Sequence, residues 1–248
     1  MDLSQLHIII PFFIVLALVA FMYASVGHGG ASGYLALMAL FSLPILVMKP
    51  SALLLNIFVS GISFWFFKKN KHFEWELFYP FAMASIPAAF IGGYIEINPG
   101  LYKQILAVFL IVAILRMLNV FGKIPIKIRE PRLWLSLVIG FSIGLFSGMI
   151  GIGGGIILSP ILILLGIATM KQAAAVSALF IFVNSIAGII GFTVKGGEIP
   201  LDAFYLLPVV IIGGSIGAIF GSGKFNSKTL TNLLAVVLVI ASVKLFLI

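Results

Sequence analysis

Long stretches of the chain carry no charged residue, and short polar breaks separate them. Residues 3–48 contain no Asp, Glu, Lys or Arg, and neither do residues 133–170. A helix needs about 20 apolar residues to cross the hydrocarbon core of a bilayer, so each stretch has room for two segments. A basic linker at residues 122–132 divides the pattern, which predicts ten apolar segments, five on each side. The other six are residues 51–67, 77–95, 101–119, 172–194, 203–223 and 230–248.

The composition agrees with a chain that lies mostly inside a bilayer. Of the 248 residues, 62% are hydrophobic and 9% are charged, whereas about 25% of residues are charged in a typical soluble domain. These values exclude a soluble enzyme, a disordered protein and a fibrous repeat. We therefore predict an all-α polytopic membrane protein. The first segment has neither a basic leader nor a small-residue cleavage site, which favours a retained helix over a cleaved signal peptide.

Chemically reactive side chains are scarce. The chain has no cysteine, which excludes disulfides, thiolate metal sites and cysteine nucleophiles. Its three histidines, His7, His28 and His72, lie far apart in the sequence. We therefore expect no metal, no other cofactor and no enzymatic activity. The net charge of +8 is interpreted as a membrane topology signal and not as a nucleic-acid surface, because no basic stripe accompanies it.

The two halves of the chain resemble each other. The sequence Gly-His-Gly-Gly at residues 27–30 matches Gly-Ile-Gly-Gly at residues 151–154, which is 124 positions later. Residues 106–111 match residues 234–239 at an offset of 128. The change in offset indicates short insertions within an old duplication.

Each half has five predicted crossings, an odd number, so the second half must run inverted relative to the first. We predict a first membrane repeat at residues 1–121, a cytoplasmic linker at residues 122–132 and a second, inverted repeat at residues 133–248. Inverted repeats with broken helices are typical of secondary transporters.

The distribution of positive charge predicts the orientation. With the central linker in the cytoplasm, ten Lys and Arg residues lie inside and three outside, as the positive-inside rule requires. The inside residues are Lys68, Lys69, Lys71, Lys123, Lys127, Arg129, Arg132, Lys171, Lys224 and Lys228. The outside residues are Lys49, Lys103 and Lys195. Both termini are then on the outer side of the cytoplasmic membrane. Glycine-rich segments that re-enter instead of spanning would weaken this argument.

Consecutive glycines interrupt the second and seventh predicted segments, at residues 29–30 and 153–155. They favour non-helical backbone, so each is predicted to break a helix inside the membrane. The helix that restarts after each break presents unpaired N–H groups and about half a positive charge, which makes an anion site without a basic side chain. The alternative is that these glycines serve only as hinges or packing contacts. The glycines at 92–93, 140, 144 and 213–214 are interpreted as contacts between helices.

A few polar side chains lie within the apolar segments. His28 is the ionisable group placed deep in a span, so it is a candidate for contact with the substrate or for proton coupling. The alternative is a neutral histidine bonded to a nearby carbonyl. Asn56 and Ser63 fall opposite Ser177 and Asn184 at an offset of 121. These four side chains are expected either to donate hydrogen bonds to an anion or to join neighbouring helices.

The candidate substrate-binding residues follow from the two breaks and these polar side chains. They are Gly27, His28, Gly29, Gly30, Ser32, Asn56, Ser63, Gly151, Gly153, Gly154, Gly155, Ser177 and Asn184.

The two Gly-x-Gly-Gly motifs, each opening one half of a small basic membrane protein, resemble those of the TauE/SafE family of sulfite exporters and toluene-sulfonate uptake permeases. The second motif, with Pro160 and Leu162 after it, is close to the family pattern. In the first motif His28 occupies the variable place, and Ala31 stands where a third glycine is usual. The resemblance covers about residues 8–248. It implies an inner-membrane carrier for sulfur-containing or organic oxyanions, such as sulfite or a sulfonate, and it supports the motif glycines as site residues.

The sequence therefore predicts a secondary transporter that moves a small oxyanion by alternating access, with proton coupling through His28 left open. The alternative is an anion channel built on the same helix ends. The expected partners are the small anionic substrate and the lipid bilayer, with no nucleic acid, and the expected state is a monomer or a homodimer.

Overall fold

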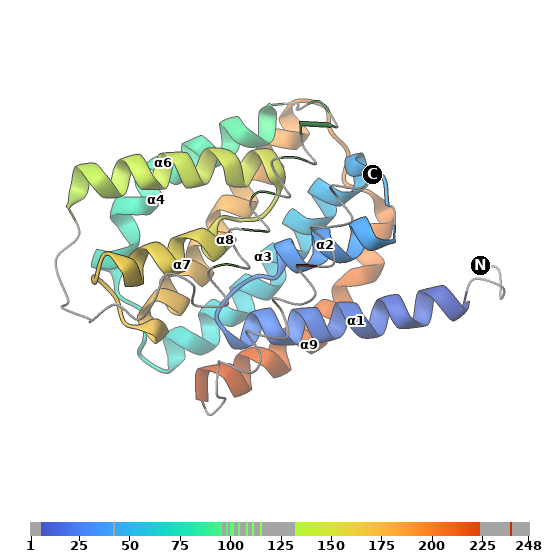
Figure 1. The fold of residues 1–248 in the computed structure, drawn as a ribbon, viewed down its shortest axis with the longest axis horizontal. Helices are drawn as coiled ribbons and strands as arrows, with labels where there is room; N and C mark the ends of the chain where they lie inside the picture. Colours follow the sequence, from blue (N-terminus) through green and yellow to red (C-terminus); the bar gives the residue numbers. More distant parts are fainter. Residues whose placement is uncertain are drawn as a thin grey trace.

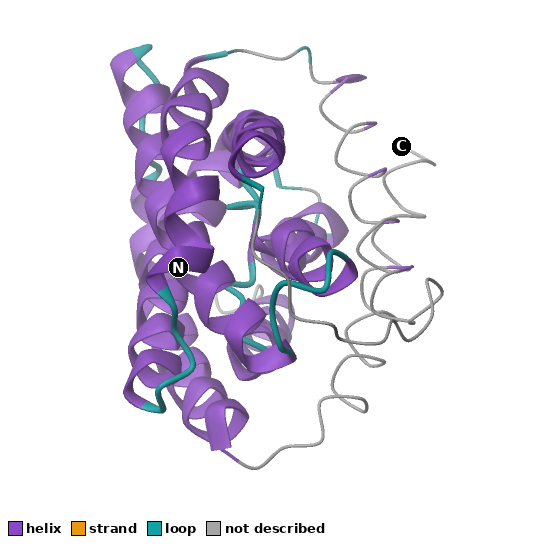
Figure 2. Ribbon diagram, turned by 90° about the vertical axis from the view of Figure 1, so that its left-hand side faces the viewer, coloured by secondary structure: helices purple, strands orange, loops and turns teal. Residues whose placement is uncertain are grey.

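The structure, a computed structural model, describes residues 6–41, 43–95 and 132–223, together with residues 98, 100, 101, 104, 108, 111, 115 and 239. In this part of the chain the secondary structure is helical, with no strand (Figure 2). The predicted linker at residues 122–132 lies outside the described residues except for Arg132. Most of the fifth and tenth predicted segments lie outside them as well.

The described helices follow the same order in each half: a long helix, a short helix and two long helices (Figure 1). In the first half they are α1 (Leu6–Ser25), α2 (Ala31–Leu40), α3 (Ile45–Lys69) and α4 (Trp75–Tyr94). In the second half they are α6 (Leu133–Ile150), α7 (Gly155–Leu164), α8 (Met170–Val194) and α9 (Leu201–Gly223). Among the described helices α3, α4, α6, α8 and α9 are long and apolar enough to cross a membrane. The all-helical, multi-span prediction is confirmed in this form.

The short helices α2 and α7 have 10 residues each, which at 1.5 Å per residue gives about 15 Å, half of the hydrocarbon core. In the first half, α2 runs back along α1, because Gly33 of α2 lies against Val19 and Tyr23 of α1. The second predicted segment is therefore a stretch of irregular backbone followed by half a helix. The seventh segment, from Gly151 through α7, has the same form.

Glycine stripes join helices from different halves. On α6, the successive positions Gly140, Gly144 and Gly148 lie against backbone carbonyls of Phe81, Ser85 and Ala89 on α4. On α9, the successive positions Gly213, Gly217 and Gly221 lie against the carbonyls of Ala17, Phe21 and Ser25 on α1. Residue numbers rise together in both sets, so each pair of helices is parallel. The predicted packing role of Gly140, Gly144 and Gly213 is confirmed, and so is that of Gly92, Gly93 and Gly214, which also lie against neighbouring helices.

The remaining helix contacts follow the same pattern in both halves. Helix α4 also packs against α8, and α9 packs against α3. The short helix α2 lies on α3, and α7 lies on α8. At the centre, α3 and α8 pack antiparallel, since Leu53 lies near Gly188 whereas Phe182 lies near Gly61. Each of these contacts thus has a counterpart in the other half, whereas the α1–α2 contact has none of similar extent between α6 and α7.

Lys49, which the sequence assigns to the outer side of the bilayer, lies within α3 and is 8% exposed. Its Nζ donates a hydrogen bond to the carbonyl of Gly93 at 3.1 Å and lies 5.6 Å from the centre of the Phe192 ring. Helix α3 starts at Ile45, six residues before the apolar run that predicts it. The long side chain of Lys49 thereby reaches the carbonyls at the C-terminal end of α4, where the helix dipole favours a cation.

At the opposite end of α3, two connections between helices meet. The Gln172 side chain donates a hydrogen bond to Glu74, and Gln172 also forms a capping box with Thr169 at the start of α8. Burial and the nearby charge of Lys171 lower the pKa of His72 in this region. The predicted inside charges of residues 68–71 and 171 therefore lie at one end of the bundle.

A matched pair of alanine substitutions on α8 tests the glycine contacts. An added Cβ at Gly191 would strike the carbonyl oxygen of Phe90, whereas an added Cβ at Gly188 finds its nearest neighbour at 3.5 Å. We expect Gly191→Ala to lower the free energy of unfolding by about 1–3 kcal/mol, the usual cost of overpacking, and Gly188→Ala to have little effect. Thermal unfolding of both variants in detergent measures the difference, and equal melting temperatures would contradict the packing.

Candidate functional site

The first glycine break lets α2 begin in the middle of the bundle. Gly27 and Gly30 have φ angles of 76° and 100°, in the left-handed region that favours glycine. The N–H of Ala31, the first residue of α2, donates a hydrogen bond of 3.0 Å to Oδ1 of Asn56 on α3. Asn56 is fully buried. A side chain from a neighbouring helix therefore caps α2, whose own N-cap residue has no side chain.

The second break has a similar backbone form, with one more glycine in the left-handed region, but no such cap. Gly151, Gly153 and Gly154 have φ angles of 92°, 72° and 78°. Within the described residues, the N–H groups of Gly155 and Ile156 have no hydrogen-bond acceptor. The start of α7 thus keeps two unpaired donors and the positive end of its dipole.

The two helix starts differ in their caps because the position in α8 that corresponds to Asn56 holds another residue. Helices α3 and α8 begin 125 residues apart, so the helix bounds place Ile181 opposite Asn56. The predicted pairing of Asn56 with Ser177, at an offset of 121, is therefore wrong, because it relied on matching polar residues and not on helix starts. Isoleucine has no atom that accepts a hydrogen bond, which accounts for the uncapped start of α7.

The two breaks converge on Asn56 and Ile181. An added Cβ at Gly153 would lie 2.6 Å from Asn56 Nδ2 and 2.6 Å from Ile181 Cγ2. An added Cβ at Gly29 would strike the same two side chains. The Asn56 amide also donates to Ser185 Oγ at 3.4 Å. Glycine at both positions lets two backbones approach one buried amide, and the starts of α2 and α7 meet there.

His28 joins the first break to the second half of the chain. Its Nε2 lies 3.2 Å from Oγ of Ser159 on α7, and Ser159 donates to Oγ of Ser177 on α8 at 2.7 Å. Because a hydroxyl has one proton, a Ser159 that donates to Ser177 accepts from His28, which assigns the proton of a neutral His28 to Nε2. His28 is half-buried. A polar chain of three side chains therefore runs from the first break into α8.

The remaining predicted polar residues lie apart from this convergence. The Ser32 hydroxyl bonds to Tyr23 Oη on α1 at 2.7 Å. Ser63 is buried, and its Oγ has no partner. The Asn184 amide donates to the Phe180 carbonyl at 2.9 Å, but its Oδ1 has no partner. The structure thus brings together Gly29, Gly30, Asn56, Gly153 and Gly155, and it connects His28 with Ser177.

Sequence reasoning did not select Ser159, Ser147 or Tyr34. Ser159 lies four residues after the start of α7, one helical turn from the break, and Ser147 lies four residues before Gly151. This spacing is a usable signal, since residues one turn from a break lie beside it. Across the described residues, no group of three His, Cys, Asp or Glu side chains is placed to hold a metal ion.

A family model described as Sulfite exporter TauE/SafE matches residues 12–245. The chain belongs to the TauE/SafE family. The glycine motifs that carry the sequence resemblance to this family form the two helix breaks at the centre of the structure.

Two curated relatives in the TauE/SafE family are named as probable membrane transporter proteins. The chain is 35% identical over 249 residues to the "Probable membrane transporter protein y4hK" of Sinorhizobium fredii, covering 99% of each chain. It is 27% identical over 215 residues to the "Probable membrane transporter protein YunE" of Bacillus subtilis, covering 79% of this chain and 78% of that protein. No solved structure matches the chain. Family and fold together indicate a multi-pass membrane transporter.

A pair of glycine substitutions separates backbone strain from crowding at the site. Gly153 and Gly196 both have positive φ angles, but an added Cβ at Gly196 has no neighbour within 4 Å. We expect Gly196→Ala to cost about 1–2 kcal/mol from backbone strain alone. Gly153→Ala is expected to cost a further 1–3 kcal/mol or so, because its Cβ meets Asn56 and Ile181. Thermal unfolding in detergent gives both values, and equal losses would refute the close approach.

Proposed function

We propose that this protein is a secondary transporter of a small sulfur-containing or organic oxyanion, sulfite or a sulfonate, across the cytoplasmic membrane. The observation that carries the proposal is the start of α7, where the N–H groups of Gly155 and Ile156 have no acceptor among the residues that the structure describes. Unpaired backbone donors are costly in a low-dielectric interior unless a ligand or water meets them. An oxyanion supplies several acceptor atoms and a charge that the helix dipole favours.

The chemistry around the two helix starts supports a weakly held anion. The side chains around Gly29 and Gly153, where the two breaks meet, are Asn56, Ile181 and Ser185, none of which is charged. Lys49 lies beside the second break at Gly151, with its Cγ 3.3 Å from an added Cβ there, but its Nζ bonds to the carbonyl of Gly93. We attribute the positive potential at the meeting point to the ends of α2 and α7. Such a site attracts an anion without binding it as tightly as a buried ion pair would, which suits release on the other side.

The matching helix contacts of the two halves support inverted repeats and alternating access. Because α4–α6 corresponds to α9–α1 and α4–α8 corresponds to α9–α3, the described helices fit an approximate two-fold relation. We propose that residues 1–121 and 133–248 form the two inverted repeats and that the linker faces the cytoplasm. The anion lies between the repeats, and each side opens in turn.

Membrane voltage determines what such a transporter needs for each direction. Moving one charge through 100 mV is worth about 2.3 kcal/mol, so an inside-negative membrane drives an anion outward without a coupled ion. Import of a monovalent anion requires a cotransported cation. The His28–Ser159–Ser177 chain, with bonds of 3.2 and 2.7 Å, is the candidate path for a coupled proton.

The direct test is anion flux in proteoliposomes with an imposed voltage, using labelled sulfite and ethanesulfonate. We expect saturable flux whose direction follows the voltage, because the carried species is an anion. Counterflow, in which unlabelled anion inside accelerates uptake of labelled anion, separates a carrier from a channel. No flux of either anion, under voltage or a pH gradient, would overturn the proposed substrate class.

Ile156→Pro tests the role of the uncapped helix start. Proline in the first turn is compatible with a helix, and the substitution removes a donor that bonds to no protein atom among the described residues. We expect the half-saturating concentration of the transported anion to rise about tenfold or more, the value of one hydrogen bond to a charged group. The control is Ile156→Ala, which shortens the side chain and keeps the N–H. Equal values for the two variants would contradict an anion at this position.

His28→Gln tests proton coupling. Glutamine keeps a hydrogen-bonding group near Ser159 but does not titrate. If uptake is proton-driven, we expect the variant to lose acceleration by a pH gradient while anion exchange continues. Unchanged pH-driven uptake in the variant would exclude this role for His28.

A further inference from the structure

The second break has a buried hydroxyl on the side that faces α6. An added Cβ at Gly154, the N-cap of α7, would lie 2.6 Å from Cγ2 of Ile143, 3.1 Å from Cε1 of Phe180 and 3.4 Å from the Cβ of Ser147. Ser147 is fully buried on the last turn of α6, and its Oγ has no hydrogen-bond partner among the described residues. A buried hydroxyl without a partner is uncommon in folded proteins and often marks a place where a ligand or water binds.

Asn184 adds a second unpaired atom on the same flank. It lies one helical turn after Phe180, whose ring lies near Gly154, and one turn before Gly188, whose nearest neighbour is Gly148 on α6. Positions one turn apart share a helix face, which puts Asn184 on the face of α8 that packs toward α6. Asn184 is fully buried, and its Oδ1 has no partner among the described residues.

The orientation of the Asn184 amide is fixed by its other bond. The atom 2.9 Å from the Phe180 carbonyl must be the nitrogen, since an oxygen there would face another acceptor. The unpaired atom is therefore a carbonyl oxygen, which accepts hydrogen bonds and cannot donate them. A group that pairs with Asn184 Oδ1 must therefore be a hydrogen-bond donor.

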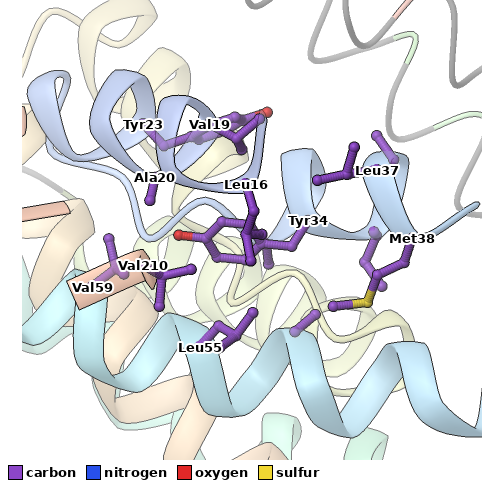
Figure 3. Packing of buried hydrophobic residues seen from close by; sticks show 14 of the residues in the cluster. Leu16, Val19, Ala20, Tyr23, Tyr34, Leu37, Met38, Leu55, Val59 and Val210 are labelled. Atoms are coloured by element: carbon purple, nitrogen blue, oxygen red, sulfur yellow. The ribbon is translucent and has the colours of Figure 1, made fainter. Parts of the chain in front are cut away.

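The corresponding place in the first half is filled by protein. The Tyr34 ring lies against Gly30, the N-cap of α2, among side chains of α1, α3 and α9 (Figure 3). The residue four positions after the second N-cap is Leu158, which is smaller and lacks a ring. The Tyr34 hydroxyl is also buried without a partner among the described residues, so the two breaks differ in the ring that fills the space beside Gly30 and not in the presence of an unpaired polar atom.

We infer that the Gly154 flank, with Ser147 and Asn184, is a subsite for an anion that carries a hydrogen-bond donor of its own, such as a hydroxyl. This inference rests on the proposed function and specifies its substrate class. The N–H groups of Gly155 and Ile156, one and two residues away, meet the acidic oxygens. Asn184 Oδ1 accepts from the donor group of the ligand, and the Ser147 hydroxyl bonds to either part. A fully deprotonated anion without a donor leaves Asn184 unsatisfied and is disfavoured.

The test compares two sulfonates that differ by one hydroxyl, 2-hydroxyethanesulfonate and ethanesulfonate. The full chain in detergent is titrated with each, and the rise in melting temperature gives an apparent affinity. We expect wild type to prefer the hydroxylated probe by about tenfold, the value of one buried hydrogen bond. Asn184→Leu, which keeps the side-chain size, and Ser147→Ala, which removes one oxygen, are expected to abolish most of this preference.

Ser51→Ala is the matched control, because the Ser51 hydroxyl on α3 is also buried without a partner but belongs to no part of the inferred subsite. It is expected to retain the preference. Equal affinity of wild type for both probes, or a preference that Asn184→Leu and Ser147→Ala leave intact, overturns this inference and leaves the anion site standing. If neither sulfonate nor sulfite stabilises wild type, the proposed function fails with it. Ser147→Ala keeps the test valid if Asn184→Leu does not fold.

Discussion

The arrangement of the helices at the centre of this protein depends on the hydrogen bond from the Ala31 N–H to Asn56 Oδ1. It lets a helix begin inside the bundle without leaving its first donor unpaired, and it fixes the amide so that Nδ2 points toward Ser185 and Gly153. Both glycine breaks depend on this arrangement. Any side chain at Gly29 or Gly153 would occupy the space of the amide, so glycine and Asn56 require each other. The half-length of α2 and α7 follows, because each helix can start only where its break ends.

The two breaks have similar backbones but different side chains around them. A capping asparagine and a tyrosine ring complete the first one, whereas an isoleucine and a leucine take the corresponding places in the second. The protein therefore has one helix start whose leading donor is bonded to a buried side chain and one whose leading donor has no acceptor among the described residues. The two starts differ in one capping side chain, and the proposed anion contact is assigned to the start that lacks it.

The glycine motifs were sufficient to predict where the helices break, because consecutive glycines in a long apolar stretch strongly favour non-helical backbone. They also led to the family. The pattern of polar residues was less informative, because it paired Asn56 with Ser177 and gave no sign that Lys49 is buried against the carbonyl of Gly93. Hydropathy indicates which residues tolerate lipid, but it carries no information about which helix start sets the register or which carbonyl a long side chain reaches. Ser147 and Ser159 were missed because a single serine in an apolar helix is ordinary until its neighbours are known.

The glycine stripes of α6 and α9 have a mechanical consequence. Each stripe binds a helix of one sequence half to a helix of the other, α6 to α4 and α9 to α1, with backbones too close for any larger residue. The two halves of the chain are therefore interlocked, and neither half holds its outer helices without the other. The α4–α6 and α1–α9 pairs, each with one helix from either half of the sequence, are therefore the most closely packed units of the bundle. A motion that keeps these backbone contacts has to keep each mixed pair together, so it cannot separate residues 1–121 from residues 133–248 as two whole bodies.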